Sequence, residues 1–256
     1  MHIANLLCEL AHKFIQWPTG EMIRSNQEEF LLIANFPGVL GCIDGCHIRI
    51  SAPHDYADIY FNRKGFYSIN MQAICDAHML FIDIYAACPG SVNDARVWTL
   101  STIREKSLRN YEHYFPEQTH ILGDKIYSVL FNLIPPFKDY VNMRIRERHF
   151  NKIHARTRQV IERAFALLVA RFRRLKHLYL QNVAYASLII LACSCLHNIC
   201  LSLDDRLAEE IILNIDADEL DNVEDVENDD DVLPENVPFH PELKRQIIVD
   251  ELYLNH

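Results

Sequence analysis

Apolar residues follow two different spacings along the chain, and this predicts mixed α and β structure. Between residues 151 and 176 they recur every three or four positions, which is typical of an α-helix; the positions are Val160, Ile161, Ala164, Phe165, Leu168, Phe172 and Leu175. Residues 184–202 are nearly all apolar, which predicts a second, buried helix. Residues 1–35 are also predicted to be helical, in two pieces broken at the sequence WPTG.

β-Branched and aromatic residues mark the predicted strands. We expect a strand over residues 39–50, a hairpin formed by residues 66–75 and 79–87, and a short buried strand over residues 119–123. A helix over residues 93–108 separates the hairpin from the last of these strands. Residues 133–141, which contain two prolines, are expected to form an irregular or edge element. This order of elements indicates an α/β fold with a mixed sheet flanked by helices.

Composition limits the class of protein. The chain has 256 residues, of which 50% are hydrophobic, enough for one sizeable core. No apolar run approaches the roughly 18 residues of a membrane span, and the N-terminus does not have the pattern of a signal peptide. None of the eight cysteines forms a CxxC pair, so no zinc framework is predicted. Buried thiols in a reducing compartment are the simplest interpretation.

The net charge of −10 conceals two oppositely charged regions. Residues 138–176 contain 12 basic and three acidic residues, which indicates either contacts with phosphates or a solvated helix face. Residues 201–256 contain three basic and 18 acidic residues. The acidic stretch within residues 203–238 is expected to be disordered. It acts as an interaction segment, as a competitor for the basic helix, or simply as a solubilising tail.

Three acidic residues have positions that suit metal chemistry. Asp44 and Asp124 each follow a short apolar run, and Glu162 lies within the predicted long helix. Two carboxylates at strand ends and one on a helix can converge on a point, and hard cations such as Mg²⁺ prefer oxygen ligands. Each residue also has an ordinary structural interpretation. Asp44 is typical of an Asp-Gly turn, Asp124 of a helix N-cap, and Glu162 of a helical ion pair with Arg158 or Arg163.

A fourth acidic residue, Asp94, lies at the start of the predicted 93–108 helix. An acidic residue there favours the helix dipole, so its position alone does not indicate a ligand. The chain contains no GK[ST], GxSxG or GxGxxG motif, and cysteine nucleophile chemistry has little support.

Six segments of the chain, in order, resemble those of one known family. They are FPGVLGCIDGCHIRI, YFNRKGFYSINMQAICD, PGSVNDARVW, ILGDKIY, FNKIHARTRQVIERAFALLVARFRRL and IILACSCLHNI. Together they are similar to the DDE-superfamily endonuclease domain of PIF/Harbinger transposases and of the harbinger transposase-derived nuclease of animals. The resemblance covers roughly residues 20–202.

The resemblance implies an RNase H-like fold and a nuclease that hydrolyses DNA phosphodiester bonds with Mg²⁺ or Mn²⁺. The residues that match the family's metal ligands are Asp44, Asp94, Asp124 and Glu162, with Asp44, Asp124 and Glu162 as the catalytic set. The spacing of 38 residues from Asp124 to Glu162 also resembles that of DDE enzymes. The family further implies a nuclear location and a separate Myb-like DNA-binding partner, but no membrane. The alternative is a domesticated, catalytically inactive scaffold that binds DNA or a partner.

The chain departs from the family pattern in a few places. Lys125 and Ile126 follow Asp124 where relatives often have a small residue and glycine, and this lysine is expected to compete with a cation or to bind the scissile phosphate. Cys46 replaces a residue that is often threonine. We expect a helical segment over residues 1–36, the DDE-type endonuclease domain over 37–202, and an acidic tail with a possible terminal helix over 203–256. The helical DNA-binding region of full-length relatives is expected to be shortened or absent. The candidate phosphate contacts are Arg156, Arg158, Arg163, Arg171, Arg173 and Arg174.

Overall fold

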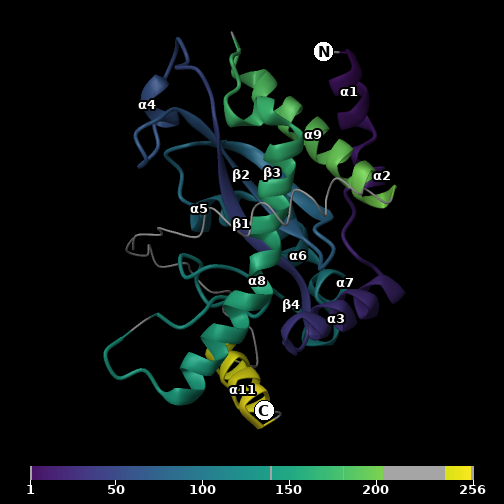
Figure 1. Ribbon diagram of the computed structural model, residues 1–256, viewed down its shortest axis with the longest axis vertical. Coiled ribbons are helices and arrows are strands. Elements are labelled where there is room, and N and C mark those ends of the chain that lie inside the picture. Colours follow the sequence, from purple (N-terminus) through teal and green to yellow (C-terminus); the bar gives the residue numbers. More distant parts are fainter. Residues whose placement is uncertain (1, 139, 181, 204–239, 255–256) are drawn as a thin grey trace.

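A mixed five-stranded sheet forms the centre of the protein (Figure 1). The computed structural model describes residues 2–138, 140–180, 182–203 and 240–254. The strand order is β3-β2-β1-β4-β5. The strands span Val39–Arg49 (β1), Ser68–Cys75 (β2), Phe81–Pro89 (β3), His120–Leu122 (β4) and Leu133–Ile134 (β5).

The strands pair as an antiparallel half and a parallel half. β1, β2 and β3 are antiparallel, whereas β4 pairs parallel to β1 and β5 pairs parallel to β4. This order and these directions are those of an RNase H-like fold, so the predicted fold class is confirmed. The predicted hairpin corresponds to β2 and β3, and the predicted edge element contains β5, which lies at the end of the sheet.

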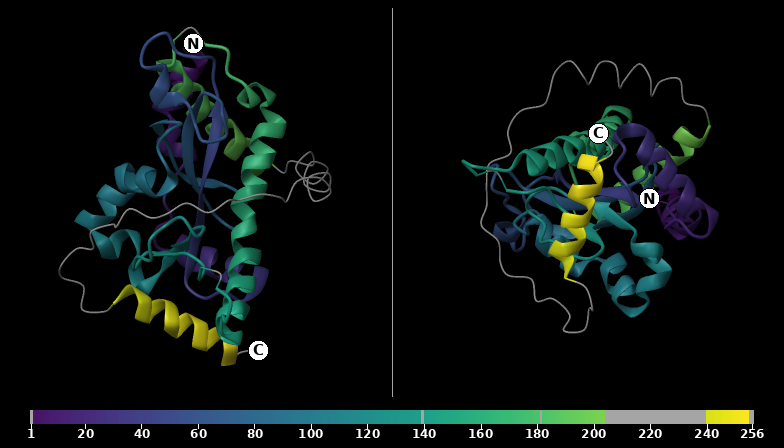
Figure 2. Two further views of the ribbon diagram at one scale, coloured as in Figure 1. Left: turned by 90° about the vertical axis from the view of Figure 1, so that its left-hand side faces the viewer. Right: turned by 90° about the horizontal axis from the view of Figure 1, so that it is seen from below.

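Helices cover both faces of the sheet (Figure 2). α8 lies on one face, and α5 and α6 lie on the other. The helices span His2–Glu9 (α1), Ala11–Phe14 (α2), Glu21–Ala34 (α3), Ala57–Tyr60 (α4), Asp94–Leu100 (α5), Thr102–Arg109 (α6), Tyr111–Tyr114 (α7), Ile145–Arg171 (α8), Ala184–Ser202 (α9) and Pro241–Leu254 (α11), with 3-10 turns at Pro116–Gln118 and Arg173–Lys176. Each face therefore has a hydrophobic core of its own, one containing Met71 and Phe150, the other Ile43 and Trp98.

α8 is the longest helix, and its apolar stripe holds it against the sheet. Phe150, Ile161, Ala164 and Leu168 are completely buried at helical spacing. Burial of each large apolar side chain stabilises such packing by about 1.5–3 kcal/mol. The helix begins at Ile145, six residues earlier than the sequence pattern indicates, and ends at Arg171.

The predicted helix over residues 93–108 is in fact two helices. Ser101 ends α5 and caps α6, because its hydroxyl accepts a hydrogen bond from the Arg104 backbone N–H. A serine that bonds to the backbone in this way favours a new helix start over continuation of the old helix.

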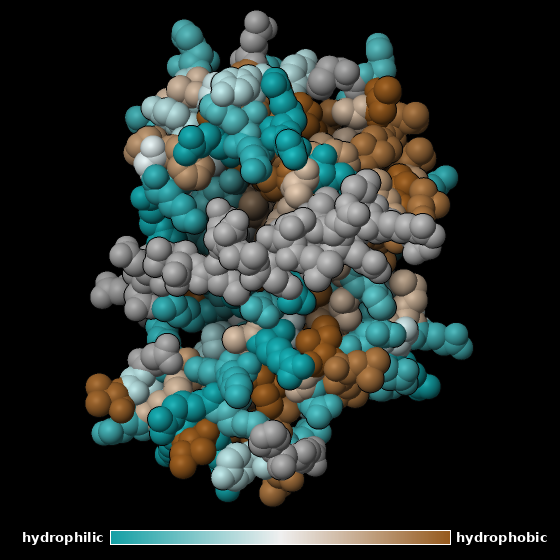
Figure 3. Space-filling model, in the orientation of Figure 1, coloured by the Kyte–Doolittle hydropathy of each residue, from teal (hydrophilic) through white to brown (hydrophobic). Residues whose placement is uncertain are grey.

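α9 is the apolar helix expected from the sequence, but it is buried on one side only, with seven of its 19 residues buried. By length and composition alone it qualifies as a helix that could cross a membrane, contrary to the expectation that no segment would. It packs against α1, α2, α8 and β3, and Ile190, Cys195 and His197 are fully buried, so it serves as a core helix here. Hydrophobic residues also gather on the surface around α1 and α9 (Figure 3).

α11 lies across the lower end of the molecule and contacts α8 (Figure 2). It is the helix expected near the C-terminus. Lys244 is buried and donates to the backbone carbonyls of Thr119 and Phe131. Residues 204–239, on which the expectation of disorder falls, lie outside the described residues.

Candidate metal centre on the central strand of the sheet

Pairing of parallel strands places Asp44 beside Asp124. Cys42 on β1 is the register partner of Leu122 on β4. Asp44 and Asp124 each lie two residues further along, Asp44 within β1 and Asp124 just beyond the end of β4, and Asp124 is close enough to add to the rise that burial causes in the pKa of Asp44. The Asp124 Oδ1 atom accepts a hydrogen bond of 3.0 Å from the Ile126 backbone N–H. The turn after β4 therefore holds Asp124 near Asp44, which lies on the central strand of the sheet.

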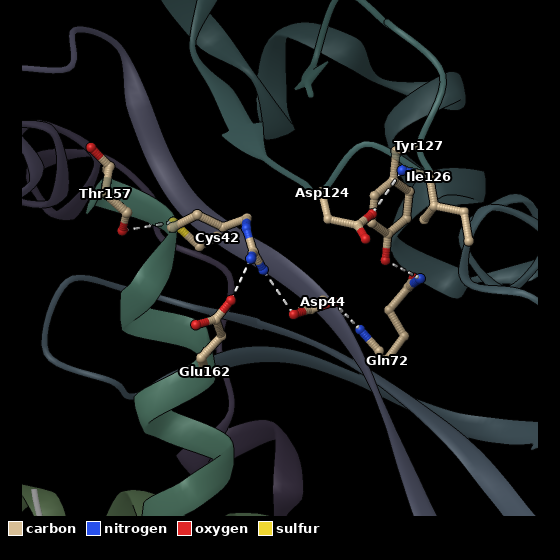
Figure 4. Close-up of polar contacts among 10 residues, drawn as sticks. Cys42, Asp44, Gln72, Asp124, Ile126, Tyr127, Thr157 and Glu162 are labelled. Atoms are coloured by element: carbon tan, nitrogen blue, oxygen red, sulfur yellow. Dashed lines mark hydrogen bonds and ion pairs between the residues drawn. The ribbon is translucent and has the colours of Figure 1, made fainter. Parts of the chain in front are cut away.

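α8 carries Glu162 to the same place (Figure 4). The Cys42 thiol donates to the Thr157 carbonyl of α8 at 3.6 Å. Cys42 and Asp44 face the same side of β1, because side chains alternate along a strand. Thr157 fixes the helix over Cys42, and Glu162, five residues later, then lies opposite Asp44 in the view of Figure 4.

Arg158 links these two carboxylates. Its Nη1 atom lies 2.9 Å from Asp44 Oδ2, and its Nη2 atom donates to Glu162 Oε1. The ion pair between Arg158 and Glu162, one of the structural interpretations of Glu162, is therefore present. Arg158 is only 18% exposed. It faces the acidic centre and not the surface on which a phosphate contact was expected.

Asp94 approaches from the opposite face of β1. A Cβ atom added to Gly45 would lie 2.1 Å from Asp94 Oδ1, so the missing side chain makes room for this carboxylate. Asn70 on β2 donates to the same oxygen at 2.7 Å. Helix capping is done by Asn93, whose side chain accepts from the Arg96 N–H. Asp94 is thus held by the sheet and is not the N-cap residue.

The sequence analysis missed two residues that support this centre. Gln72 donates to the Asp94 carbonyl and to the Tyr127 hydroxyl, both at 3.1 Å. It lies in β2, whose eight residues are all buried. Buried polar side chains require hydrogen-bond partners. The presence of Asn70 and Gln72 in a mostly apolar strand could therefore have indicated that both residues support a polar site. Nothing in the sequence singled out Tyr127.

Burial and mutual repulsion shift the pKa values of the acids. Burial raises the pKa of Asp44 to about 7; Arg158 opposes this shift, and Asp124 and Asp94 add to it. Burial likewise raises the pKa of Asp124 above its usual range. Burial lowers the pKa of Arg158, but Asp44 and Glu162 outweigh it and leave the pKa raised, so the guanidinium stays charged. Asp44, Asp94 and Asp124 therefore act on one another electrostatically, as a shared site requires.

The donor chemistry fits a divalent cation, although the side chains are not arranged around one. All four acids offer carboxylate oxygens, which Mg²⁺ and Mn²⁺ prefer. Within the described ranges, no three acidic, histidine or cysteine side chains are grouped so as to hold a metal ion. The reason is visible at Arg158, whose guanidinium occupies the position of a cation between Asp44 and Glu162.

Other candidate groups have structural roles. His197 hydrogen-bonds the Met79 carbonyl and Arg171, which turns Arg171 away from the solvent. Burial raises the pKa of the Cys42 and Cys46 thiols, which argues against thiolate chemistry beside Asp44. Lys125, the next residue along the chain, partly opposes the rise that burial causes in the pKa of Asp124.

The fold and site together define a class of protein: an RNase H-like domain with acidic residues gathered at the centre of its sheet. Residues 43–198 match the DDE superfamily endonuclease family, and the chain belongs to that family. It is 33% identical over 204 residues to the rat protein named "Putative nuclease HARBI1" and 32% identical to its human counterpart, in each case over 78% of this chain and 57% of the relative. An Arabidopsis thaliana protein, "Protein ALP1-like", is 27% identical over 79% of this chain and 52% of the relative.

These matches identify the chain as harbinger transposase-derived. The chain spans a little over half the length of these curated relatives. No solved structure matches it.

Proposed function

We propose that the protein is a divalent-metal-dependent endonuclease that hydrolyses DNA phosphodiester bonds. The observation that carries this proposal is that Asp44, Asp94 and Asp124 act on one another electrostatically while Arg158 joins Asp44 to Glu162; the four acids come from one strand, two helices and one turn. Family membership and the word nuclease in the names of the relatives support the reaction class.

Asp44, Asp124 and Glu162 would hold Mg²⁺ or Mn²⁺, with Asp94 assisting. When bound, such a cation activates the attacking water and offsets the charge that develops on the phosphate. The carboxylates need no proton-transfer role of their own. Asn70 fixes the orientation of Asp94, and the Ile126 N–H fixes Asp124, so both ligands are oriented in advance.

A basic stripe on α8 supports DNA as the substrate. The stripe consists of the exposed residues Arg144, Arg148, Lys152 and Arg156, four positions apart along the helix. From Arg144 to Arg156 there are 12 residue steps, which correspond to a rise of about 18 Å at 1.5 Å per residue. One DNA strand carries a phosphate about every 3.4 Å along its axis, so the stripe matches about five phosphates. Glu162 lies six residues beyond Arg156 on the same helix, so we expect a DNA backbone bound to the stripe to pass near the acidic centre.

The test is cleavage of duplex DNA by the full chain with Mg²⁺ or Mn²⁺. Asp44→Asn and Glu162→Gln remove one ligand charge each, and we expect each to reduce cleavage at least about 100-fold, because second-shell changes alone cost about 10–100-fold. Glu105→Gln is the matched control, since Glu105 is exposed and pairs with Arg109 on α6. Undiminished cleavage by both site variants would show that the assignment is wrong.

A second candidate function is favoured by Arg158. If its guanidinium held Asp44 and Glu162 permanently, the protein would be a non-cleaving scaffold that binds DNA or a partner. A Myb-like DNA-binding protein is the partner proposed from the family, with the nucleus as the location. Mn²⁺ titration separates the two functions, because a scaffold of this kind would bind its partner but would not be stabilised by Mn²⁺.

A further inference from the structure

Arg158 is the cation of the acidic centre as the structure shows it. The side chains of Arg158 and Asp44 are 18% and 19% exposed, and Glu162 is 33% exposed. Charges this deeply placed are costly unless they are paired, and loss of one partner leaves the other charge uncompensated. The guanidinium therefore stabilises Asp44 and Glu162 in the protein without metal.

The charge balance makes this role necessary. Burial raises the pKa of Asp44, and the nearby carboxylates of Asp124 and Asp94 raise it further, so Asp44 needs a positive charge beside it to stay ionised. Arg158 reaches two of the four acids through hydrogen bonds, one to Oδ2 of Asp44 and one to Oε1 of Glu162. Planar guanidinium groups suit such double contacts, because their donors are fixed in a fork.

The same contacts exclude a metal ion. A cation shared by Asp44 and Glu162 needs oxygen atoms that now accept hydrogen bonds from Arg158, and it would repel the guanidinium between them. We propose that Arg158 occupies, in the metal-free protein, the place that a divalent cation takes between Asp44 and Glu162, and that the cation binds by displacing it. The proposal depends on the metal site of the proposed function, and makes Arg158 a positioning residue that sets the metal affinity.

Metal binding by the full chain, without DNA, tests the proposal directly. The free Mn²⁺ concentration is followed by electron paramagnetic resonance for the wild type, Arg158→Ala and Arg158→Gln. Removal of the competing charge should tighten Mn²⁺ binding at least about tenfold, equivalent to about 1.4 kcal/mol. Arg109→Ala is the matched control, because Arg109 is exposed and pairs with Glu105 on α6, so its loss should leave the affinity unchanged.

Thermal unfolding gives a second readout. In excess EDTA, Arg158→Ala should unfold at a lower temperature than the wild type, and Mn²⁺ should raise its melting temperature by more than it raises that of the wild type. If Arg158→Ala does not fold, Arg158→Gln, which retains hydrogen-bond donors without the charge, is measured in the same way. Mn²⁺ binding that is unchanged or weaker in the neutral variants would overturn the proposal, since Arg158 would then support the site instead of competing for it.

The outcomes separate this proposal from the proposed function. Tighter Mn²⁺ binding by the neutral variants, with no DNA cleavage by the wild type, would support displacement of Arg158 by the cation and would contradict the nuclease function. DNA cleavage by the wild type, with no gain in Mn²⁺ affinity in the neutral variants, would contradict displacement of Arg158 and would support the nuclease function.

Discussion

At the scale of single residues, the acidic centre depends on a glycine as much as on its acids. Gly45 follows Asp44 and faces the other side of β1, where its missing side chain admits the Asp94 carboxylate. The Asp-Gly pair resembles a turn in the sequence, but both residues lie inside strand β1. Asp44 faces one side of the strand, and Gly45 faces Asp94 on the other. Glycine is needed here because the Asp94 carboxylate approaches the backbone closely, and not because the backbone angle requires it.

Gly45→Ala should displace Asp94, because the new Cβ would lie 2.1 Å from its Oδ1 atom. The atom in the way is the end of a flexible side chain, so the protein should still fold while its Mn²⁺ affinity falls about tenfold, as for other changes that disturb ligand orientation. Calorimetric titration with Mn²⁺ measures the effect. In an Asp94→Ala background, Gly45→Ala should have no further effect; two independent losses that add would refute the steric explanation.

At the scale of elements, α8 combines three functions on different faces. Its apolar face anchors it to the sheet, its edge carries Arg158 and Glu162, and its open face carries the basic stripe. The basic region noted in the sequence is thus divided, since Arg158 and Arg171 are engaged within the protein and Arg156 is exposed.

The stripe should determine DNA affinity without affecting the metal. Replacement of Arg148, Lys152 and Arg156 together by Gln should weaken binding to duplexes of any sequence and reduce the slope of log affinity against log salt by about one per lost phosphate contact. Fluorescence anisotropy at several salt concentrations measures both, with Mn²⁺ affinity as the internal control. Arg109→Gln, an exposed arginine on α6, should change neither; an unaltered salt slope in the triple variant would exclude the stripe from DNA contact.

The sequence predicts most elements because their apolar patterns are long and regular, as in α8 and β2. It predicts Asp124 just after a strand and Glu162 on a helix, as the structure has them, whereas Asp44, which was expected at a strand end, lies in the middle of β1. It does not predict that Arg158 lies between two of them, because that contact joins residues 114 positions apart through tertiary packing. The roles of Gln72 and Tyr127 depend in the same way on contacts between β2 and the turn after β4.

At the scale of the whole molecule, stability depends on histidines held neutral in the core. His154 on α8 is buried, and one ring nitrogen lies 2.9 Å from the Ile134 carbonyl of β5. Burial lowers its pKa to about 3 from an ordinary value of 6.5. Below pH 6.5 His154 therefore binds a proton in the unfolded chain but not in the folded protein. The free energy of unfolding consequently falls as the pH falls from 6.5 towards 3.

His154→Gln should reduce this acid sensitivity, because glutamine retains a hydrogen-bond donor but does not titrate. The wild type should lose, relative to the variant, up to about 1.4 kcal/mol for each pH unit below 6.5. Urea unfolding at pH 7, 5 and 4 measures the difference. Comparison with the variant is essential, since the raised pKa values of Asp44 and Asp83 act in the opposite direction. Equal pH dependence in both proteins would contradict a neutral His154.

The distance along the chain between Asp44 and Glu162 has a consequence for synthesis. The ribosome releases β1 long before α8, so a growing chain holds Asp44 without the helix that completes the centre. A chain that is cut short before α8 can pair its early strands but cannot assemble all four carboxylates. In the proposed nuclease, cleavage would therefore have to await the synthesis of α8, which carries Glu162.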